Sequence, residues 1–110
     1  MNKLGEKLAD AWTKKDLINL NAEEYPKNRK ESYLIQKEFH KTLNKKTVGW
    51  KIGMVTKKLQ EGANVDGPMI GKIIDETVLM NPLKIQYNKV PHCILECEFA
   101  LKFFDSHKRR

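Results

Sequence analysis

The sequence is poor in cysteine, which limits how the fold can be held together. Its two cysteines, Cys93 and Cys97, are four residues apart in a segment with the alternating pattern of a β-strand. On an extended strand they would stand about 13 Å apart, too far for a disulfide bond. We interpret both as reduced cysteines of the core, and a zinc site that uses His92 or His107 is the alternative.

Long apolar runs are also missing. No run of about 18 apolar residues occurs, so we expect no membrane-spanning helix. The first six residues lack the apolar stretch of a signal peptide, and we expect a cytoplasmic protein. With 110 residues, of which 40% are hydrophobic, the chain can form one domain with a modest core.

Acidic residues are outnumbered, and the formal net charge is +7. The basic excess lies in residues 1–58 and in the last three residues, whereas residues 59–107 are net acidic. A basic half can bind nucleic acid. However, the lysines alternate with glutamates, and aromatic residues make up only 8% of the chain. This pattern favours a solvated helical surface, and we do not expect a nucleic-acid partner.

Two helices are predicted in the first 46 residues. Residues 3–20 carry apolar side chains at helical spacing, at Leu4, Leu8, Ala11, Trp12, Leu17 and Leu20. A second apolar stripe, Ile35, Phe39 and Leu43, predicts a helix over about 28–44. Lys45 and Lys46 follow it, where positive charge favours the C-terminal end of a helix.

From residue 47 onward the apolar period becomes that of β-strands. Thr56 can cap a short helical turn at 57–60 that ends at Gly62, and Asp66-Gly67-Pro68 predicts a turn. Strands are predicted at 48–55, 69–74, 77–80, 83–87 and 92–104. The expected fold class is therefore α+β. We expect a single domain, 1–110, with a helical part at about 1–46, a strand-rich part at about 47–104 and a basic tail at 105–110.

Two glutamates, Glu96 and Glu98, form the first candidate site. Side chains at i and i+2 of a strand point to the same face, so the two carboxylates would stand roughly 6–7 Å apart. A strand with one solvated face would show this pattern. A pair of oxygen ligands for a hard cation such as Mg²⁺ or Mn²⁺ would show it too. The spacing leaves both interpretations open.

A lysine between two glycines forms the second candidate site. Gly49, Lys51 and Gly53 alternate along the first predicted strand and share one face. Glycine in a strand often marks the close approach of a ligand, so Lys51 and Gly53 could line a slot for an anionic molecule. Alternatively, Lys51 marks an edge strand, where a lysine discourages aggregation. The chain shows no phosphate-binding loop and no catalytic triad pattern beside this slot.

Several segments, taken together, resemble a known family. They are Ser32-Tyr33-Leu34-Ile35-Gln36, Gly49-Trp50-Lys51-Ile52-Gly53-Met54, Gly71, Pro91 and Leu95-Glu96-Cys97-Glu98-Phe99-Ala100. In order and spacing they resemble the N-terminal part of the 2-keto-4-pentenoate hydratase and 4-oxalocrotonate decarboxylase family, within the fumarylacetoacetate hydrolase superfamily. The resemblance covers about residues 3–104 and implies the start of that superfamily's β-rich fold.

The resemblance also implies a chemistry. Members of this family bind Mg²⁺ or Mn²⁺ through the two glutamates of an E-x-E strand and a third acidic residue further along. Their substrate is a short 2-oxo acid, and the lysine of the G-W-K-I-G segment lies in the same pocket. By this resemblance Glu96 and Glu98 are metal ligands, and Lys51 binds substrate or transfers a proton.

Two departures from the family pattern affect this expectation. Family members are much longer, and a third acidic ligand is not found here. Met69 also stands where an acidic residue often precedes the glycine at position 71, with Asp66 nearby but shifted. We expect a truncated homologue that acts on unsaturated 2-oxo acids (2-hydroxydienoates) and is weakly active or inactive alone, so enzymatic activity stays open. The alternative is a non-enzymatic remnant that self-associates or pairs with a related chain.

Overall fold

The computed structural model describes residues 3–80, 84 and 94–103. The chain divides into two units, 1–79 and 80–110, and each is described by itself. The first contains all the regular secondary structure found in the described residues. Whether the chain forms the single domain expected from its length stays a prediction.

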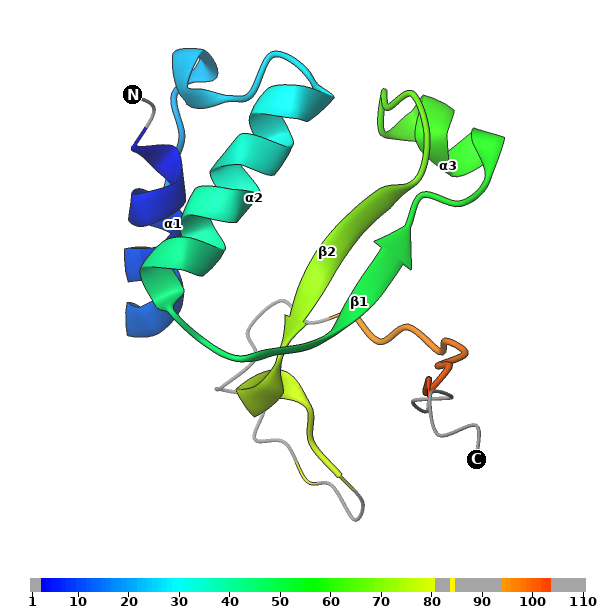
Figure 1. Ribbon diagram of the computed structural model, residues 1–110. Coiled ribbons are helices and arrows are strands. Elements are labelled where there is room, and N and C mark those ends of the chain that lie inside the picture. The colour runs from blue at the N-terminus through cyan, green and yellow to red at the C-terminus, as the bar shows by residue number, and fades with distance from the viewer. Residues whose placement is uncertain (1–2, 81–83, 85–93, 104–110) are drawn as a thin grey trace, which may run out of the picture. The chain divides into compact units, whose positions relative to one another are not determined.

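Two helices, α1 (Leu4–Lys14) and α2 (Arg29–Leu43), pack side by side in the first unit and run in the same direction (Figure 1). Their contact contains four of the five buried apolar side chains of the described residues, namely Leu4, Ala9, Ala11 and Ile35. Between the helices the chain forms one 3₁₀ turn, η1 (Ala22–Glu24), in which Asn21 and Glu24 form a capping box. The helix pair is therefore the main apolar core of this unit.

Helix α2 has clear start and stop signals. The Asn28 side chain accepts a hydrogen bond from the backbone N–H of Glu31 at 2.9 Å, and the Glu31 carboxylate accepts one from the N–H of Lys27 at 2.8 Å. These bonds satisfy donors that the first turn leaves open. Asn44 ends the helix in the left-handed conformation and donates its N–H to the carbonyl of His40. The prediction of a helix over about 28–44 is confirmed.

Helix α1 is shorter than the predicted 3–20. It ends at Lys14, and Lys15 takes the left-handed conformation with φ of 61°. The N–H of Asp16 then bonds the carbonyl of Ala11 at 2.9 Å, and that of Lys15 bonds the carbonyl of Trp12 at 3.3 Å. This pair of bonds is a Schellman ending. The predicted continuation through Leu17 was wrong, and Leu17 is left exposed.

A two-stranded antiparallel sheet follows the helices. Strand β1 (Thr47–Gly53) pairs with β2 (Met69–Ile74), and a bulge shifts the register between Thr47 and Gly49. The short helix α3 (Lys57–Gly62) lies in the connection, where the Thr56 side chain accepts the N–H of Leu59 as predicted. After β2 comes a 3₁₀ turn, η2 (Asp75–Thr77). The strands predicted at 48–55 and 69–74 are confirmed to within two residues.

Side chains of α2 hold the outer edge of β2. The backbone N–H of Ile70 donates to the Tyr33 hydroxyl at 3.2 Å, and the Ile70 carbonyl accepts from the Gln36 amide at 3.1 Å. One turn earlier, Arg29 binds the Asp66 carboxylate at 2.7 Å and the Pro68 carbonyl at 2.7 Å. A single stripe of α2 therefore positions the hairpin on the helix pair.

Two further strand predictions were wrong. Residues 77–80 contain the end of η2 and an irregular stretch instead of a strand. The segment 94–103 has no regular structure, although its alternating pattern predicted the strand at 92–104. A strand needs a hydrogen-bonded neighbour, and alternation cannot supply one. The strand predicted at 83–87 lies almost wholly outside the described residues.

The observed architecture is thus a mixture of helices with a small antiparallel sheet, compatible with the α+β class. The larger β half that the resemblance implied is not formed in the described residues. Among the helices that the structure describes, none has the length and apolar character needed to cross a membrane.

Candidate functional site

Lys51 lies in the middle of β1, surrounded by glycines. Gly49 and Gly53 are its neighbours on the same strand face, and Gly71 is its direct cross-strand partner on β2. The sequence pattern indicated the first two glycines. It did not indicate Gly71, whose position opposite Lys51 depends on the register of the hairpin.

The three glycines are not equally open. A Cβ atom at Gly53 would meet no atom of the described residues within 4 Å, so the space beside it is open in that part of the chain. At Gly49 the Ile73 side chain lies 3.6 Å from that position, and at Gly71 the Gln36 amide nitrogen lies at 3.9 Å. The slot expected on both sides of Lys51 therefore opens mainly toward Gly53.

The ammonium group of Lys51 is exposed. It donates a hydrogen bond to the carbonyl of Ile52 at 3.3 Å. On the opposite sheet face Lys72 lies over the Trp50 ring, with its ammonium 5.8 Å from the ring centroid. Lys51 and Lys72 therefore lie on opposite faces of the sheet. Lys51 is the one that lies on the same face as Gly53.

Glu96 and Glu98 are both exposed in the second unit. Because no strand forms there, the structure does not fix them as neighbours on one sheet face. Among the described residues, no group of three or more His, Cys, Asp or Glu side chains lies close enough together to hold a metal ion. The two glutamates alone therefore stand as the candidate metal ligands.

Cys97, between these glutamates, was expected to be buried in the core. It is a free thiol and is exposed, in a segment that forms no strand among the described residues. That expectation was wrong for Cys97, while Cys93 lies outside the described residues. The alternative was a zinc site with His92 or His107, and both of these residues also lie outside the described residues.

Asp66 has a structural role. Its carboxylate pairs with Arg29, and the guanidinium holds the pKa of Asp66 below its usual range. The same hydrogen bond raises the pKa of Arg29. Asp66 therefore links the turn before β2 to α2. No contact among the described residues places Asp66 beside Lys51.

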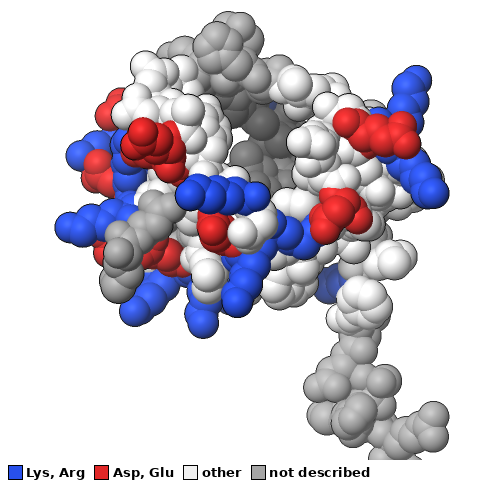
Figure 2. All heavy atoms as spheres, turned by 90° about the horizontal axis from the view of Figure 1, so that it is seen from above, with Lys and Arg blue, Asp and Glu red and all other residues white. Residues whose placement is uncertain are grey.

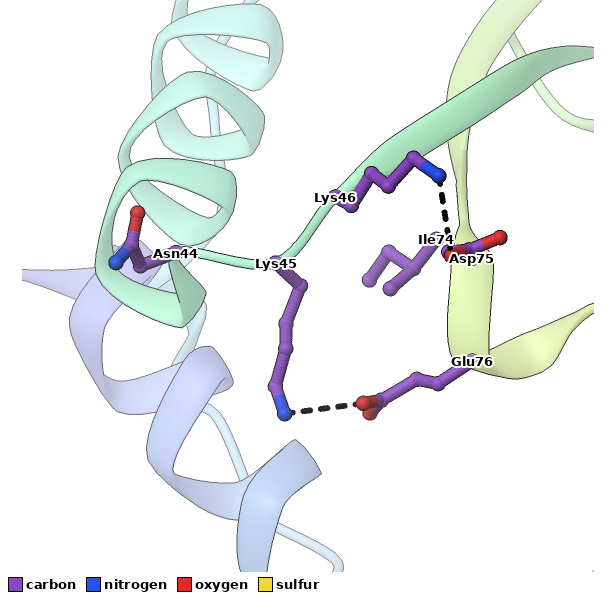
Figure 3. Close-up of a pocket in the computed structure, with 6 residues that line it drawn as sticks. All are labelled: Asn44, Lys45, Lys46, Ile74, Asp75 and Glu76. Atoms are coloured by element: carbon purple, nitrogen blue, oxygen red, sulfur yellow. Dashed lines mark hydrogen bonds and ion pairs between the residues drawn. The ribbon is translucent and has the colours of Figure 1, made fainter.

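A hollow of about 390 Å³ lies where the chain leaves α2 and where β2 ends. Figure 3 shows two ion pairs across it, between Lys45 and Glu76 at 3.0 Å and between Lys46 and Asp75 at 3.5 Å. The N–H of Asp75 also bonds the carbonyl of Lys46 at 2.9 Å. Since each lysine faces a carboxylate, the hollow is better suited to joining the two segments than to binding an anion.

A second, apolar hollow of about 560 Å³ lies along the helix pair. Its lining is mostly aliphatic and aromatic, with Leu8, Trp12, Leu17, Ile18, Ile35 and Phe39 as the main apolar members. No titratable pair or cluster of candidate metal ligands stands in it. This lining is suited to apolar packing along the helix pair and offers no group of residues for catalysis or metal binding.

Tyr33 and Gln36 acquire a role that the sequence did not reveal. They belong to the Ser32–Gln36 segment that supported the family resemblance, where no function was assigned to them. In the structure they hold both backbone polar groups of Ile70. Their spacing of three residues on a helix, before a strand, is the only signal that could have suggested this role.

Comparisons with known proteins add no relative. No family model matches the chain, and neither a curated protein nor a solved structure matches it.

Proposed function

We propose that this chain carries the lysine and the glutamate pair of a metal-dependent hydratase or decarboxylase for short unsaturated 2-oxo acids. The observation that supports it best is the setting of Lys51, a cation on a strand whose three nearest face neighbours are glycines, with open space at Gly53. From the Gly53 side a small carboxylate can approach such a cation. A cytoplasmic location is part of the proposal.

In this proposal the residues of the chain have separate tasks. Lys51 binds the substrate carboxylate or moves a proton at its ammonium nitrogen. Gly53 leaves the space in which the substrate lies, and β1 holds both at fixed register against β2. Glu96 and Glu98 supply two anionic oxygen ligands.

The donor set fits a hard divalent cation, Mg²⁺ or Mn²⁺, in chemical type. Carboxylate oxygens are the ligands these ions prefer, and Mg²⁺ usually keeps several waters and binds through one or two carboxylates. The bound ion would supply charge stabilisation at the substrate's 2-oxo oxygen. Two carboxylates give weak affinity, which is consistent with the expectation of weak activity.

Metal binding tests the role of the glutamate pair. Titration of the full chain with Mn²⁺, followed by the loss of the free-ion electron paramagnetic resonance signal, should show one weak site. Glu96→Gln and Glu98→Gln should each weaken it by roughly tenfold or more. Glu61→Gln, which removes an exposed carboxylate of α3, is the control and should leave the affinity unchanged. Equal affinity in all variants would exclude the glutamate pair as ligands.

Substrate conversion tests the role of Lys51. The assay follows the consumption of a 2-hydroxydienoate by its absorbance in the presence of Mn²⁺. Lys51→Ala should need a higher substrate concentration than the wild type to reach half of its maximal rate. Lys58→Ala, on the exposed side of α3, is the matched control. Conversion that is independent of metal and unchanged in Lys51→Ala would contradict the catalytic proposal.

The alternative function, a self-associating or partner-binding module, is favoured by a different observation. The segment 94–103 exposes nearly all of its large apolar side chains to solvent. Exposed apolar segments of this kind commonly mark interaction sites. This module needs no metal and no substrate.

A further inference from the structure

Strand β1 has a sheet edge that no strand covers among the described residues. The N–H and carbonyl of Ile70 both point away from β1, because both bond side chains of α2. Ile52 is the cross-strand partner of Ile70. In an antiparallel pair, partners of this kind both direct their backbone groups outward. The outer edge of β1 therefore presents the backbone polar groups of Ile52 and, two residues earlier, of Trp50.

The other edge of the sheet is closed to a further strand. Tyr33 and Gln36 occupy the outward N–H and carbonyl of Ile70, and Arg29 binds the carbonyl of Pro68. A strand that approached β2 would have to displace these three side chains. Any strand that adds to the hairpin must therefore add at β1.

The segment 94–103 has the pattern of a strand but forms no strand in the structure. Leu95, Phe99, Leu101 and Phe103 have exposed fractions between 83% and 105%, and no regular structure forms around them. These apolar side chains are therefore available for a strand partner. A second molecule can cover them.

We propose that residues 96–100 of a second copy add as an antiparallel strand to the outer edge of β1. The register that matches both patterns places Glu98 opposite Lys51. It then places Phe99 opposite Trp50 and Cys97 opposite Ile52, with Glu96 opposite Gly53 and Ala100 opposite Gly49. Every apolar residue of one strand meets an apolar residue of the other on the same face.

Charge supports this register. Lys51 and Glu98 form a pair without mutual backbone bonds, in which side chains of adjacent strands approach most closely. The glycines beside Lys51 leave room for both carboxylates of the incoming segment. In one copy the Lys51 ammonium donates a hydrogen bond to the Ile52 carbonyl at 3.3 Å. On pairing, it binds the Glu98 carboxylate of the second copy instead.

The pairing is reciprocal when each copy donates its segment to the other. Two identical contacts related by a twofold axis give a closed dimer. The pairing stands on the strand patterns and not on the proposed catalysis. Its test is therefore made in EDTA, where no divalent cation can bridge the glutamates.

Substitutions that reverse the charge of Lys51 or of Glu98 test the pairing. Sedimentation equilibrium of the full chain at low salt should show a monomer–dimer equilibrium. Lys51→Glu and Glu98→Lys should each raise the dissociation constant by roughly tenfold, because the unfavourable pair occurs twice in the dimer. An equimolar mixture of the two variants should recover wild-type association, because every Lys–Glu contact is then restored between copies. Lys58→Glu is the control and should associate like the wild type.

Three outcomes would overturn the proposal. They are a monomer at all concentrations, a dimer that neither variant weakens, and a mixture that fails to recover. A second measurement applies if a charge variant does not fold. Ile52→Cys should form a covalent dimer through Cys97 on mild oxidation, since opposed residues of adjacent strands lie within disulfide range. With Cys93→Ser in both proteins to remove the other thiol, Ile52→Cys combined with Cys97→Ser should not form a covalent dimer, and a covalent dimer in that protein would contradict the register.

Discussion

At the scale of single residues, the ion pair between Arg29 and Asp66 joins positions that are 37 residues apart. Its hydrogen bond lowers the pKa of Asp66 and raises that of Arg29. Both side chains are on the surface, so the pair contributes only modestly to stability. It nevertheless fixes the turn that leads into β2.

The lowered pKa of Asp66 gives the pair a definite pH dependence. Because the folded pKa lies below the unfolded value, the contribution is present above about pH 3.9 and is lost as the pH falls through the folded pKa. We expect Asp66→Asn to lower the urea midpoint slightly at pH 7 and to match the wild type at low pH. Urea unfolding followed by tryptophan fluorescence at both pH values measures this. A difference that grows on acidification would contradict the assignment, and Glu61→Gln should show no such trend.

Residue-level prediction from the sequence succeeded where the signal is local. Thr56 and its helix follow from capping preferences, and the position of Lys51 between two glycines follows from alternation. The roles of Gly71 and Tyr33 could not be predicted. Each depends on a contact between distant parts of the chain, namely strand register and helix docking.

At the scale of elements, α1 and α2 lie very close together at Gly5. Its N–H donates to the Glu38 carboxylate at 3.2 Å. A Cβ atom there would stand 2.7 Å from the carbonyl oxygen of Ile35 and 2.6 Å from the Cβ of Glu38. Two helices can cross at this distance only if one of them has no side chain at the contact.

Gly5→Ala should therefore destabilise the protein by about 1–3 kcal/mol, the usual cost of overpacking. The substitution does so although alanine is the better helix former by about 1 kcal/mol. Gly62→Ala is the matched control, because a Cβ there meets nothing within 4 Å, and it should be neutral or slightly stabilising. Thermal unfolding of the two variants beside the wild type checks this. Equal stability of both would show that the helices do not touch at Gly5.

Element boundaries were predictable where the chain carries explicit signals. Asn28 and Asn44 bound α2, and both are residue types that favour helix ends. Helix α1 was predicted six residues too long, because Lys15 takes the left-handed conformation without being glycine or asparagine. The segment 94–103 was predicted as a strand because alternation describes a single chain segment, whereas a strand also requires a partner.

At the scale of the whole molecule, the excess of positive charge is interspersed with carboxylates. Lys7 pairs with Glu24 at 2.8 Å and Lys14 with Asp10 at 2.7 Å. Figure 2 shows acidic and basic side chains next to one another over much of the visible face, with several basic side chains together along its lower edge. Interspersed charges of both signs give a weak field at a distance.

We therefore expect only weak, sequence-independent binding to nucleic acid. Fluorescence anisotropy of a labelled DNA duplex and of an RNA strand should show some binding at low salt, which disappears at about 150 mM salt. The two nucleic acids should behave alike, since the interaction depends on phosphate charge. Sequence-selective binding that persists at this salt concentration would contradict the expectation that the protein has no nucleic-acid partner.

The side chains that hold Ile70 make the hairpin an asymmetric building block. With Tyr33 and Gln36 on one flank, a sheet can be lengthened through this hairpin only from the β1 side. An endless ribbon, as in amyloid, needs a unit that accepts neighbours on both flanks. Loss of the two α2 side chains would therefore do more than loosen a helix from a strand: it would turn a unit that ends a sheet into one that could propagate it.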